Sequence, residues 1–122
     1  MNNKSAWIYC RIDAPEDTHG ALKGQYEKLE TYAAQMSFDI VGSSQDLGSG
    51  LNLDCSGLQA VLEAAKAGSF QVLLLDSVSR IGRDMTKTIN LIQTISGCNV
   101  SIYSPIEGEI KLSDFAIPPF QL

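Results

Sequence analysis

Short apolar runs alternate along this chain with longer segments in which apolar residues recur every three to four positions. The first pattern predicts buried strands and the second predicts amphipathic helices. Strands that are connected through helices pack into a parallel sheet, and the helices cover both of its faces. The sequence therefore predicts a three-layer α/β fold with a mainly parallel sheet of four to five strands. The clearest strands are expected at 6–12, 39–43, 71–75 and 100–103, and the helices at 20–36, 56–68 and 84–97.

The length of the chain fits one domain. Its 122 residues can bury a sizeable core, and 44% of them are hydrophobic. We expect the packed domain at 1–104, where the last clear strand ends, and a C-terminal tail at 105–122. Pro118 and Pro119 exclude a helix at that point of the tail, which is expected to be extended, hairpin-like or disordered.

Charge and composition narrow the classes of partner. The net charge is −5, with nine Lys and Arg residues, so the domain by itself is expected to bind DNA only weakly. No apolar run reaches the roughly 18 residues of a membrane span and the N-terminus does not begin a signal peptide, which predicts a cytoplasmic protein. The three cysteines and the single His19 show no metal-ligand spacing, so neither a metal nor a cofactor is expected.

Two arginines follow the apolar run 72–75, at the point where a helix is expected to begin. Arg80 and Arg83 would lie at a helix N-terminus beside a strand end, which is where α/β proteins bind anions. The guanidinium fork is suited to phosphate oxygens. Arg11 lies near the carboxyl end of the first strand, so all three arginines are expected at one edge of the sheet. The alternative is that Arg80 and Arg83 are solvated or pair with the carboxylates of Asp76 and Asp84.

Other conspicuous residues have ordinary structural interpretations. The aliphatic stripes of the helices are expected to form the core, and Tyr9 is expected to cover the edge of the sheet rather than to contact DNA. Gly48 and Gly50 follow the second predicted strand. They predict a flexible loop rather than a phosphate cradle.

Five short segments together resemble the catalytic N-terminal domain of the serine recombinases, the family of resolvases and invertases. The resemblance covers roughly residues 5–104 and implies a resolvase-like fold and a role in site-specific DNA recombination, integration or resolution. It also implies strand exchange within an oligomer of recombinase subunits. The segments, in the family's order, are Tyr9-Cys10-Arg11-Ile12, Leu22-Lys23-Gly24-Gln25, Asp46-Leu47-Gly48-Ser49-Gly50, Gly57-Leu58 and Ser79-Arg80-Ile81-Gly82-Arg83-Asp84.

The resemblance also implies roles for single residues. In this family a serine attacks a DNA phosphodiester and forms a 5′-phosphoserine link without a metal or a cofactor. By resemblance, Arg11, Arg80 and Arg83 would hold the scissile phosphate, and Gln25 would help to orient the site. Ser79 occupies a position where many members of the family carry Asp.

The position of the nucleophilic serine is occupied by Asp13 in this chain. A carboxylate about 4 Å from an anionic diester costs on the order of 4 kcal/mol at an effective dielectric near ~20, a repulsion that a neutral hydroxyl does not carry. Asp13 could also neutralise Arg11, which precedes it on the same strand face. We therefore expect the catalytic chemistry to be impaired. Cys55-Ser56 likewise replace the Arg-Pro that usually precedes Gly57-Leu58.

Three functional interpretations follow. The first is a recombinase catalytic domain, for which a substitute nucleophile would be needed. The second is a recombinase-derived interaction or regulatory module that does not cleave DNA. The third is a phospho-receiver domain with Asp13 and Asp76 at strand ends, although the arginines have no role in that scheme. Candidate substitute hydroxyls are Thr18, Ser43, Ser44, Ser49 and Ser77.

Overall fold

The computed structural model describes residues 3–12, 20–49, 52–53, 56–76 and 85–111. At its centre lies a sheet with the strand order β3-β2-β1-β4-β5-β6. Strands β2, β1, β4 and β5 are parallel, and the short edge strands β3 and β6 run antiparallel to their neighbours. The bounds are β1 Ser5–Ile12, β2 Asp39–Ser49, β3 Asn52–Leu53, β4 Val72–Leu74, β5 Ser101–Ser104 and β6 Gly108–Ile110.

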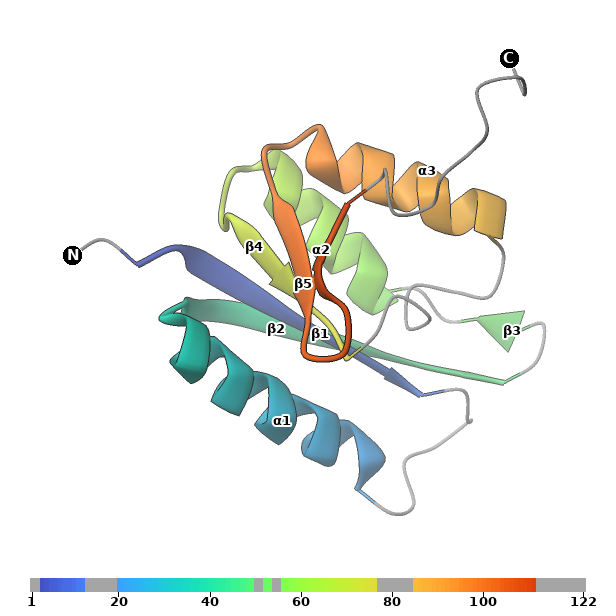
Figure 1. The fold of residues 1–122 in the computed structure, drawn as a ribbon. Coiled ribbons are helices and arrows are strands. Elements are labelled where there is room, and N and C mark those ends of the chain that lie inside the picture. Colours follow the sequence, from blue (N-terminus) through green and yellow to red (C-terminus); the bar gives the residue numbers. More distant parts are fainter. Residues whose placement is uncertain (1–2, 13–19, 50–51, 54–55, 77–84, 112–122) are drawn as a thin grey trace.

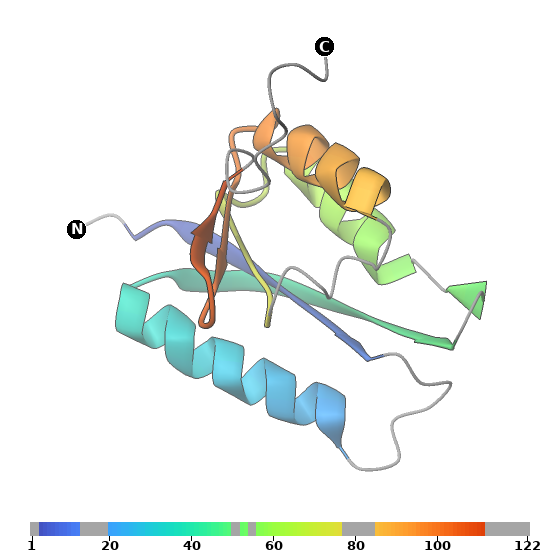
Figure 2. The same ribbon diagram turned by 45° about the vertical axis from the view of Figure 1, so that its right-hand side comes forward.

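Three helices complete the layers. Helix α1 (Ala21–Met36) lies on one face of the sheet, and α2 (Ser56–Lys66) and α3 (Met85–Ser96) lie side by side on the other (Figures 1 and 2). The predicted α/β fold with a mainly parallel sheet is confirmed. Four to five strands were expected, and the sheet has six, because the two-residue β3 adds to it at the β2 edge and β6 at the β5 edge. None of the helices described has the length and apolar character needed to cross a bilayer.

The core has two halves because successive side chains of a strand point to opposite faces. Ile8 and Cys10 of β1 pack with Leu29 on the α1 side, and Tyr9 packs with Val61 on the α2 side. Every third or fourth residue of α1 is buried, from Leu22 to Ala33. Met36, the last residue of α1, is 41% exposed, so the buried face of the helix ends one turn earlier.

The end of the second strand differs from the sequence-based expectation. The second strand was expected to end at residue 43, but β2 continues to Ser49 because it pairs with β1 as far as Leu47 and then with β3. Gly48 therefore belongs to a strand and not to a flexible loop, whereas Gly50 lies outside the described residues. Strand β6 lies in the segment expected to be a tail and pairs with β5. A domain boundary at 104 stays a prediction.

Candidate functional site

The carboxyl ends of β1 and β4 separate after a short ladder, and Arg11 lies beyond that point. The two strands pair only from Ala6 and Val72 to Ile8 and Leu74, whereas β1 continues along β2 to Ile12. Arg11 is therefore three residues beyond the last β1–β4 pair, and it is only 3% exposed. Buried backbone groups need hydrogen-bond partners, and β4 no longer offers them at this position.

Gln25 of α1 supplies those partners. Its side-chain carbonyl accepts a hydrogen bond of 3.1 Å from the Arg11 N–H, and its amide group donates one of 2.8 Å to the Arg11 carbonyl. The side-chain amide thus binds the strand end as a neighbouring strand would. Gln25 is itself buried, so the bonds are shielded from water. The pair fixes the backbone from which the Arg11 guanidinium projects.

Asp46 of β2 forms a second buried polar cluster at the same end of the sheet. The Tyr9 hydroxyl donates a 2.6 Å hydrogen bond to Oδ2 of Asp46. The Asp46 carboxylate also accepts hydrogen bonds from the backbone N–H groups of Gly57 (2.6 Å) and Leu58 (2.9 Å). These N–H groups belong to the first turn of α2, where donors lack helical partners and a negative charge is stabilised. Asp46 therefore caps α2 from a neighbouring strand.

The ionisation of Tyr9 reflects this environment. Burial raises the pKa of Tyr9 above its ordinary value of 10.0, and the hydrogen bond to Asp46 and the charge of that carboxylate raise it further. The Arg11 guanidinium, which lies near the Tyr9 hydroxyl, acts in the opposite direction. Tyr9 is therefore a neutral donor at physiological pH, and it connects Arg11 to the Asp46 cluster.

Gly57 lies where the start of α2 approaches β2 closely. A Cβ atom at this position would be 2.5 Å from the backbone oxygen of Gln45 and 2.9 Å from Oδ1 of Asp46. The Gly57 carbonyl accepts a 2.8 Å hydrogen bond from Ser44, whose hydroxyl accepts one of 3.0 Å from the indole of Trp7. The absence of a side chain thus allows the helix start to reach the strand that caps it.

A further ion pair lies at the end of β4. Nζ of Lys28, on α1, is 3.0 Å from Oδ1 of Asp76, which lies two residues beyond the end of β4. Asp76 was expected either to pair with an arginine or to act as a receiver carboxylate. Among the residues that the structure describes, its charged partner is Lys28.

Of the predicted site residues, Arg11 and Gln25 are described, and the structure joins them. Asp13, Ser79, Arg80 and Arg83 lie outside the described residues, as do the candidate nucleophiles Thr18 and Ser77. Tyr9 does not cover an edge: it is completely buried.

Asp46 was missed as a candidate, although it begins one of the five segments that carry the family resemblance. The feature of the sequence that could have identified it is its position: an acidic residue two positions beyond Ser44, in a segment that continues the strand pattern.

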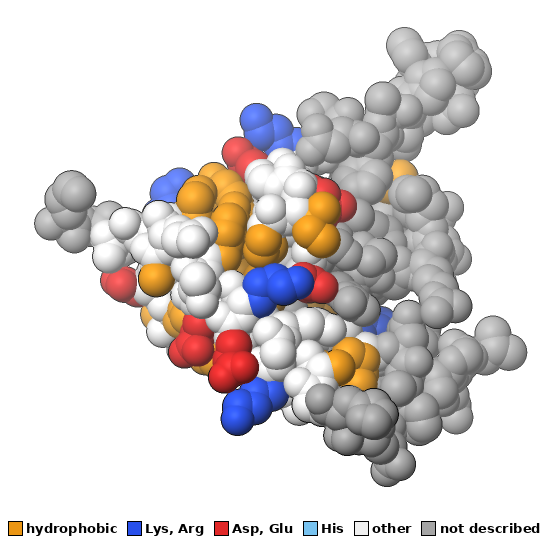
Figure 3. All heavy atoms as spheres, turned by 60° about the horizontal axis from the view of Figure 1, so that its bottom comes forward, with side chains coloured by type: hydrophobic (Ala, Val, Ile, Leu, Met, Phe, Trp, Pro, Cys, Tyr) orange, Lys and Arg blue, Asp and Glu red, His pale blue; other side chains and the backbone are white. Residues whose placement is uncertain are grey.

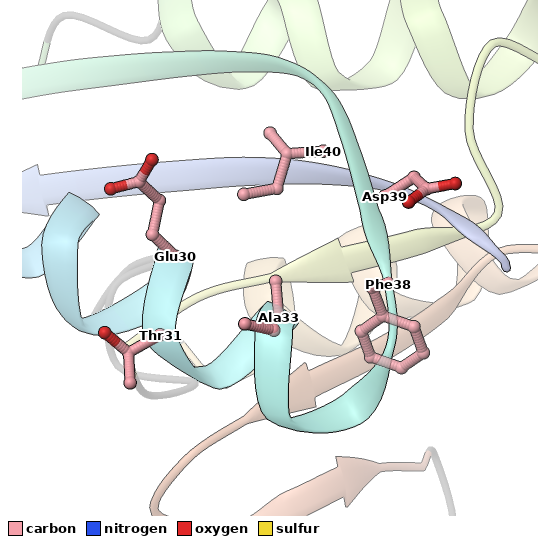
Figure 4. A pocket seen from close by; sticks show the side chains of 7 residues that line it. Glu30, Thr31, Ala33, Phe38, Asp39 and Ile40 are labelled. Atoms are coloured by element: carbon pink, nitrogen blue, oxygen red, sulfur yellow. The ribbon is translucent and has the colours of Figure 1, made fainter.

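The pockets of the described part do not coincide with this cluster. A shallow pocket of about 630 Å³ lies between the second half of α1 and the start of β2 (Figure 4). It is at the amino end of this strand, whereas the cluster around Arg11 and Asp46 is at the carboxyl ends of the parallel strands. Glu30 and Asp39 contribute carboxylates to its lining, and none of the seven lining residues is basic, so the pocket does not suit a phosphate. In the described segments no three His, Cys, Asp or Glu side chains gather in a way that could hold a metal ion.

The surface around α1 carries charges of both signs. Figure 3 shows acidic and basic side chains interspersed on this face, with no single basic patch among the described residues. A surface of this kind gives little general attraction for DNA. This face is therefore not suited to bind DNA through general charge attraction.

Comparison with known structures defines the class of the fold as that of serine recombinase catalytic domains. A resolvase family site-specific recombinase from Streptococcus pneumoniae matches with a TM-score of 0.76 and 19% identity, over 87% of this chain and 74% of the other. The N-terminal catalytic domain of TP901-1 integrase matches with a TM-score of 0.71 and 19% identity, over 86% and 79%. The C-terminal catalytic domain of ISC1926 TnpA, an IS607-like serine recombinase, matches with a TM-score of 0.72 and 25% identity. The match covers 82% of this chain and 68% of the other.

The sequence itself identifies the family. The family model of the resolvase N-terminal domain matches residues 6–116, which is most of the chain. The chain therefore belongs to the resolvase N-terminal domain family.

Proposed function

We propose that this domain is a recombinase-type module that binds a DNA phosphodiester at the carboxyl end of β1, and that Asp13 impairs cleavage of that diester. The observation that carries the proposal is the placement of Arg11. Its backbone is held by both hydrogen bonds from Gln25, and it is buried at the strand end. A buried arginine on a backbone held in this way has less freedom to lose when it binds an anion, which favours binding.

Arg80 and Arg83 complete the proposed site. They match the family's arginines in sequence and follow the end of β4, which lies next to β1 in the sheet. Carboxyl ends of parallel strands meet at one edge, where α/β proteins bind anionic ligands. Ser79 and Gln25 are proposed to orient the site. No metal or cofactor enters the proposal.

Asp13 distinguishes this chain from an active family member. A carboxylate at the nucleophile's position repels the phosphodiester and competes with it for arginine. An acyl phosphate formed with DNA would be labile to water and would store bond energy poorly for religation. We therefore propose that the domain retains the surroundings of a phosphate site without the ordinary chemistry of the serine recombinases.

The second candidate function is that of a non-cleaving partner of other recombinase subunits. The replacement of the serine by Asp13 and of Arg-Pro by Cys55-Ser56 favours it. Such a module would assemble with copies of itself or with related subunits and bind DNA weakly through this domain. The phospho-receiver alternative has less support, because Asp76 pairs with Lys28. Failure of acetyl phosphate with Mg²⁺ to produce a hydroxylamine-sensitive label would remove it.

An NMR titration with a short DNA duplex at low salt tests the main proposal. The side-chain N–H signals of the arginines would be followed in the wild type, in Asp13→Ser and in Asp13→Asn. Asp13→Asn removes the charge without supplying a hydroxyl, so it separates repulsion from nucleophilicity. We expect both variants to bind more tightly than the wild type, with the Arg11 signal shifting in each.

Cleavage is tested separately, through covalent protein–DNA adducts. A denaturing gel should show no adduct for the wild type or Asp13→Asn. An adduct in the wild type that disappears in Asp13→Asn would overturn the proposed impairment. Absence of any shift at Arg11 in all three proteins would overturn the phosphate site.

A further inference from the structure

Lys28 connects α1 to a buried carboxylate at the end of β4. The Asp76 side chain is only 10% exposed, whereas that of Lys28 is 56% exposed. Exposed ion pairs contribute little, but a buried carboxylate is costly unless it is paired or hydrogen-bonded. The ammonium group of Lys28, whose Nζ is 3.0 Å from Oδ1 of Asp76, therefore compensates the charge of this buried carboxylate.

The same helix face also holds β1. Gln25 and Lys28 are three residues apart on α1, so their side chains project from neighbouring positions. Gln25 binds the backbone of Arg11, and Lys28 binds Asp76. Arg11 lies three residues beyond the last β1–β4 pair and Asp76 lies two residues beyond it. Helix α1 thus connects the two strand ends where their own ladder has stopped.

Asp76 and Arg11, the arginine that is proposed to bind phosphate, both lie beyond the last β1–β4 pair, at the carboxyl ends of these parallel strands. A carboxylate at this position would repel the phosphodiester if its charge were not balanced. Balancing that charge with a side chain from α1 reduces its repulsion of a phosphodiester bound at this end of the sheet. The same contact holds the end of β4 at the helix that positions Arg11.

We propose that Lys28 is a positioning residue of the phosphate site, acting through its ion pair with Asp76 rather than by contacting DNA. The inference rests on the proposed function, because it assigns Lys28 a role at that same site. It predicts that the contribution of Lys28 to the affinity for DNA depends on the presence of the Asp76 carboxylate.

A double-mutant cycle in the Asp13→Ser chain tests this dependence. Dissociation constants for a short DNA duplex at low salt would be measured for Lys28→Met, Asp76→Asn and the double variant. We expect Lys28→Met to weaken binding about fivefold when Asp76 is present and less than about twofold in the Asp76→Asn background. Lys28→Arg should restore binding, because it keeps the charge.

The matched control is Lys66→Met, which removes the same charge from the far end of α2. It should change the affinity by less than about twofold, because distant exposed charges are screened by salt. The unfolding midpoint of each variant in urea confirms that the proteins are folded. Lys28→Gln is the second variant if Lys28→Met is unstable.

The outcomes separate the two proposals. An equal loss on Lys28→Met with and without the Asp76 carboxylate would mean that Lys28 contacts DNA directly, and would overturn the inference. If neither the wild type nor Asp13→Ser binds DNA, the proposed function fails. In that case the positioning role is tested on the protein without DNA, through the NMR signal of the Arg11 side-chain N–H. A shift of this signal in Lys28→Met but not in Lys66→Met supports the positioning role. An unchanged signal overturns it.

Discussion

The Tyr9 hydroxyl donates a hydrogen bond of 2.6 Å to Oδ2 of Asp46, and both side chains are buried. This contact joins β1 to β2 on the face covered by α2, and the same carboxylate caps that helix. Strands β1 and β2 and the first turn of α2 are therefore joined through the Asp46 carboxylate, which forms one buried polar centre. Because Arg11 lies two residues beyond Tyr9 on the same strand face, we expect the geometry of this centre to affect the proposed phosphate site.

Removal of the Asp46 carboxylate should destabilise the fold. Asp46→Ala leaves the Tyr9 hydroxyl and two α2 backbone donors without their acceptor, so we expect a loss of about 3 kcal/mol in the free energy of unfolding. Urea denaturation measures this loss, and hydrogen exchange at Gly57 and Leu58 should accelerate. Asp39→Ala is the control, since Asp39 is exposed on the same strand, and should cost less than about 0.5 kcal/mol. Equal losses in the two variants would contradict the capping role.

Alanine should have opposite effects at two glycines. Gly57→Ala places a Cβ atom 2.5 Å from the Gln45 backbone oxygen, which cannot move independently of β2. We expect a loss of about 3 kcal/mol. Gly24 is a solvent-exposed residue of α1, and a Cβ atom added there would meet no other atom within 4 Å. Gly24→Ala should therefore stabilise the protein by about 0.5 to 1 kcal/mol. Thermal unfolding of both variants checks the signs, and a stable Gly57→Ala protein would refute the close approach.

Gln25 should contribute both to stability and to the proposed site. Gln25→Met keeps the length of the side chain but leaves the N–H and carbonyl of Arg11 unpaired, at a cost of about 2 kcal/mol. The Arg11 backbone amide should also lose protection from hydrogen exchange. Gln35→Met, on the exposed side of the same helix, serves as the control and should change neither quantity. Unaltered exchange at Arg11 in Gln25→Met would exclude the backbone role of Gln25.

The raised pKa of Tyr9 predicts a loss of stability in alkaline solution. Above about pH 10 the tyrosine of the unfolded chain loses its proton while buried Tyr9 keeps it, so the folded state binds more protons. The stabilisation is therefore complete below pH 10 and falls as the pH rises further, by up to about 1.4 kcal/mol per pH unit. Urea unfolding of the wild type and Tyr9→Phe between about pH 9 and 11 measures it. Tyr9→Phe should show a shallower decline, and parallel curves would contradict the assignment.

Much of the fold could be predicted because its signals are local. The alternation of apolar strands with helical stripes predicted the three layers and a mainly parallel sheet, and the period of two predicted that Arg11 shares a strand face with Tyr9. The end of β2 could not be predicted in this way. Gly48 carries a loop signal, and only pairing with β1 and β3 continues the strand through it. Local propensity was overridden by tertiary contacts.

The sequence by itself determined the α/β class, the family resemblance and the position of Arg11 near the carboxyl end of β1. Only the tertiary structure decided what holds the ends of the strands. Gln25 binds a residue 14 positions away, Asp46 accepts from Tyr9 at 37 positions, and Lys28 pairs with Asp76 at 48. The physical reason is that a residue's face follows from the period of its own segment, whereas a buried polar group takes whichever partner the completed packing brings within hydrogen-bond distance.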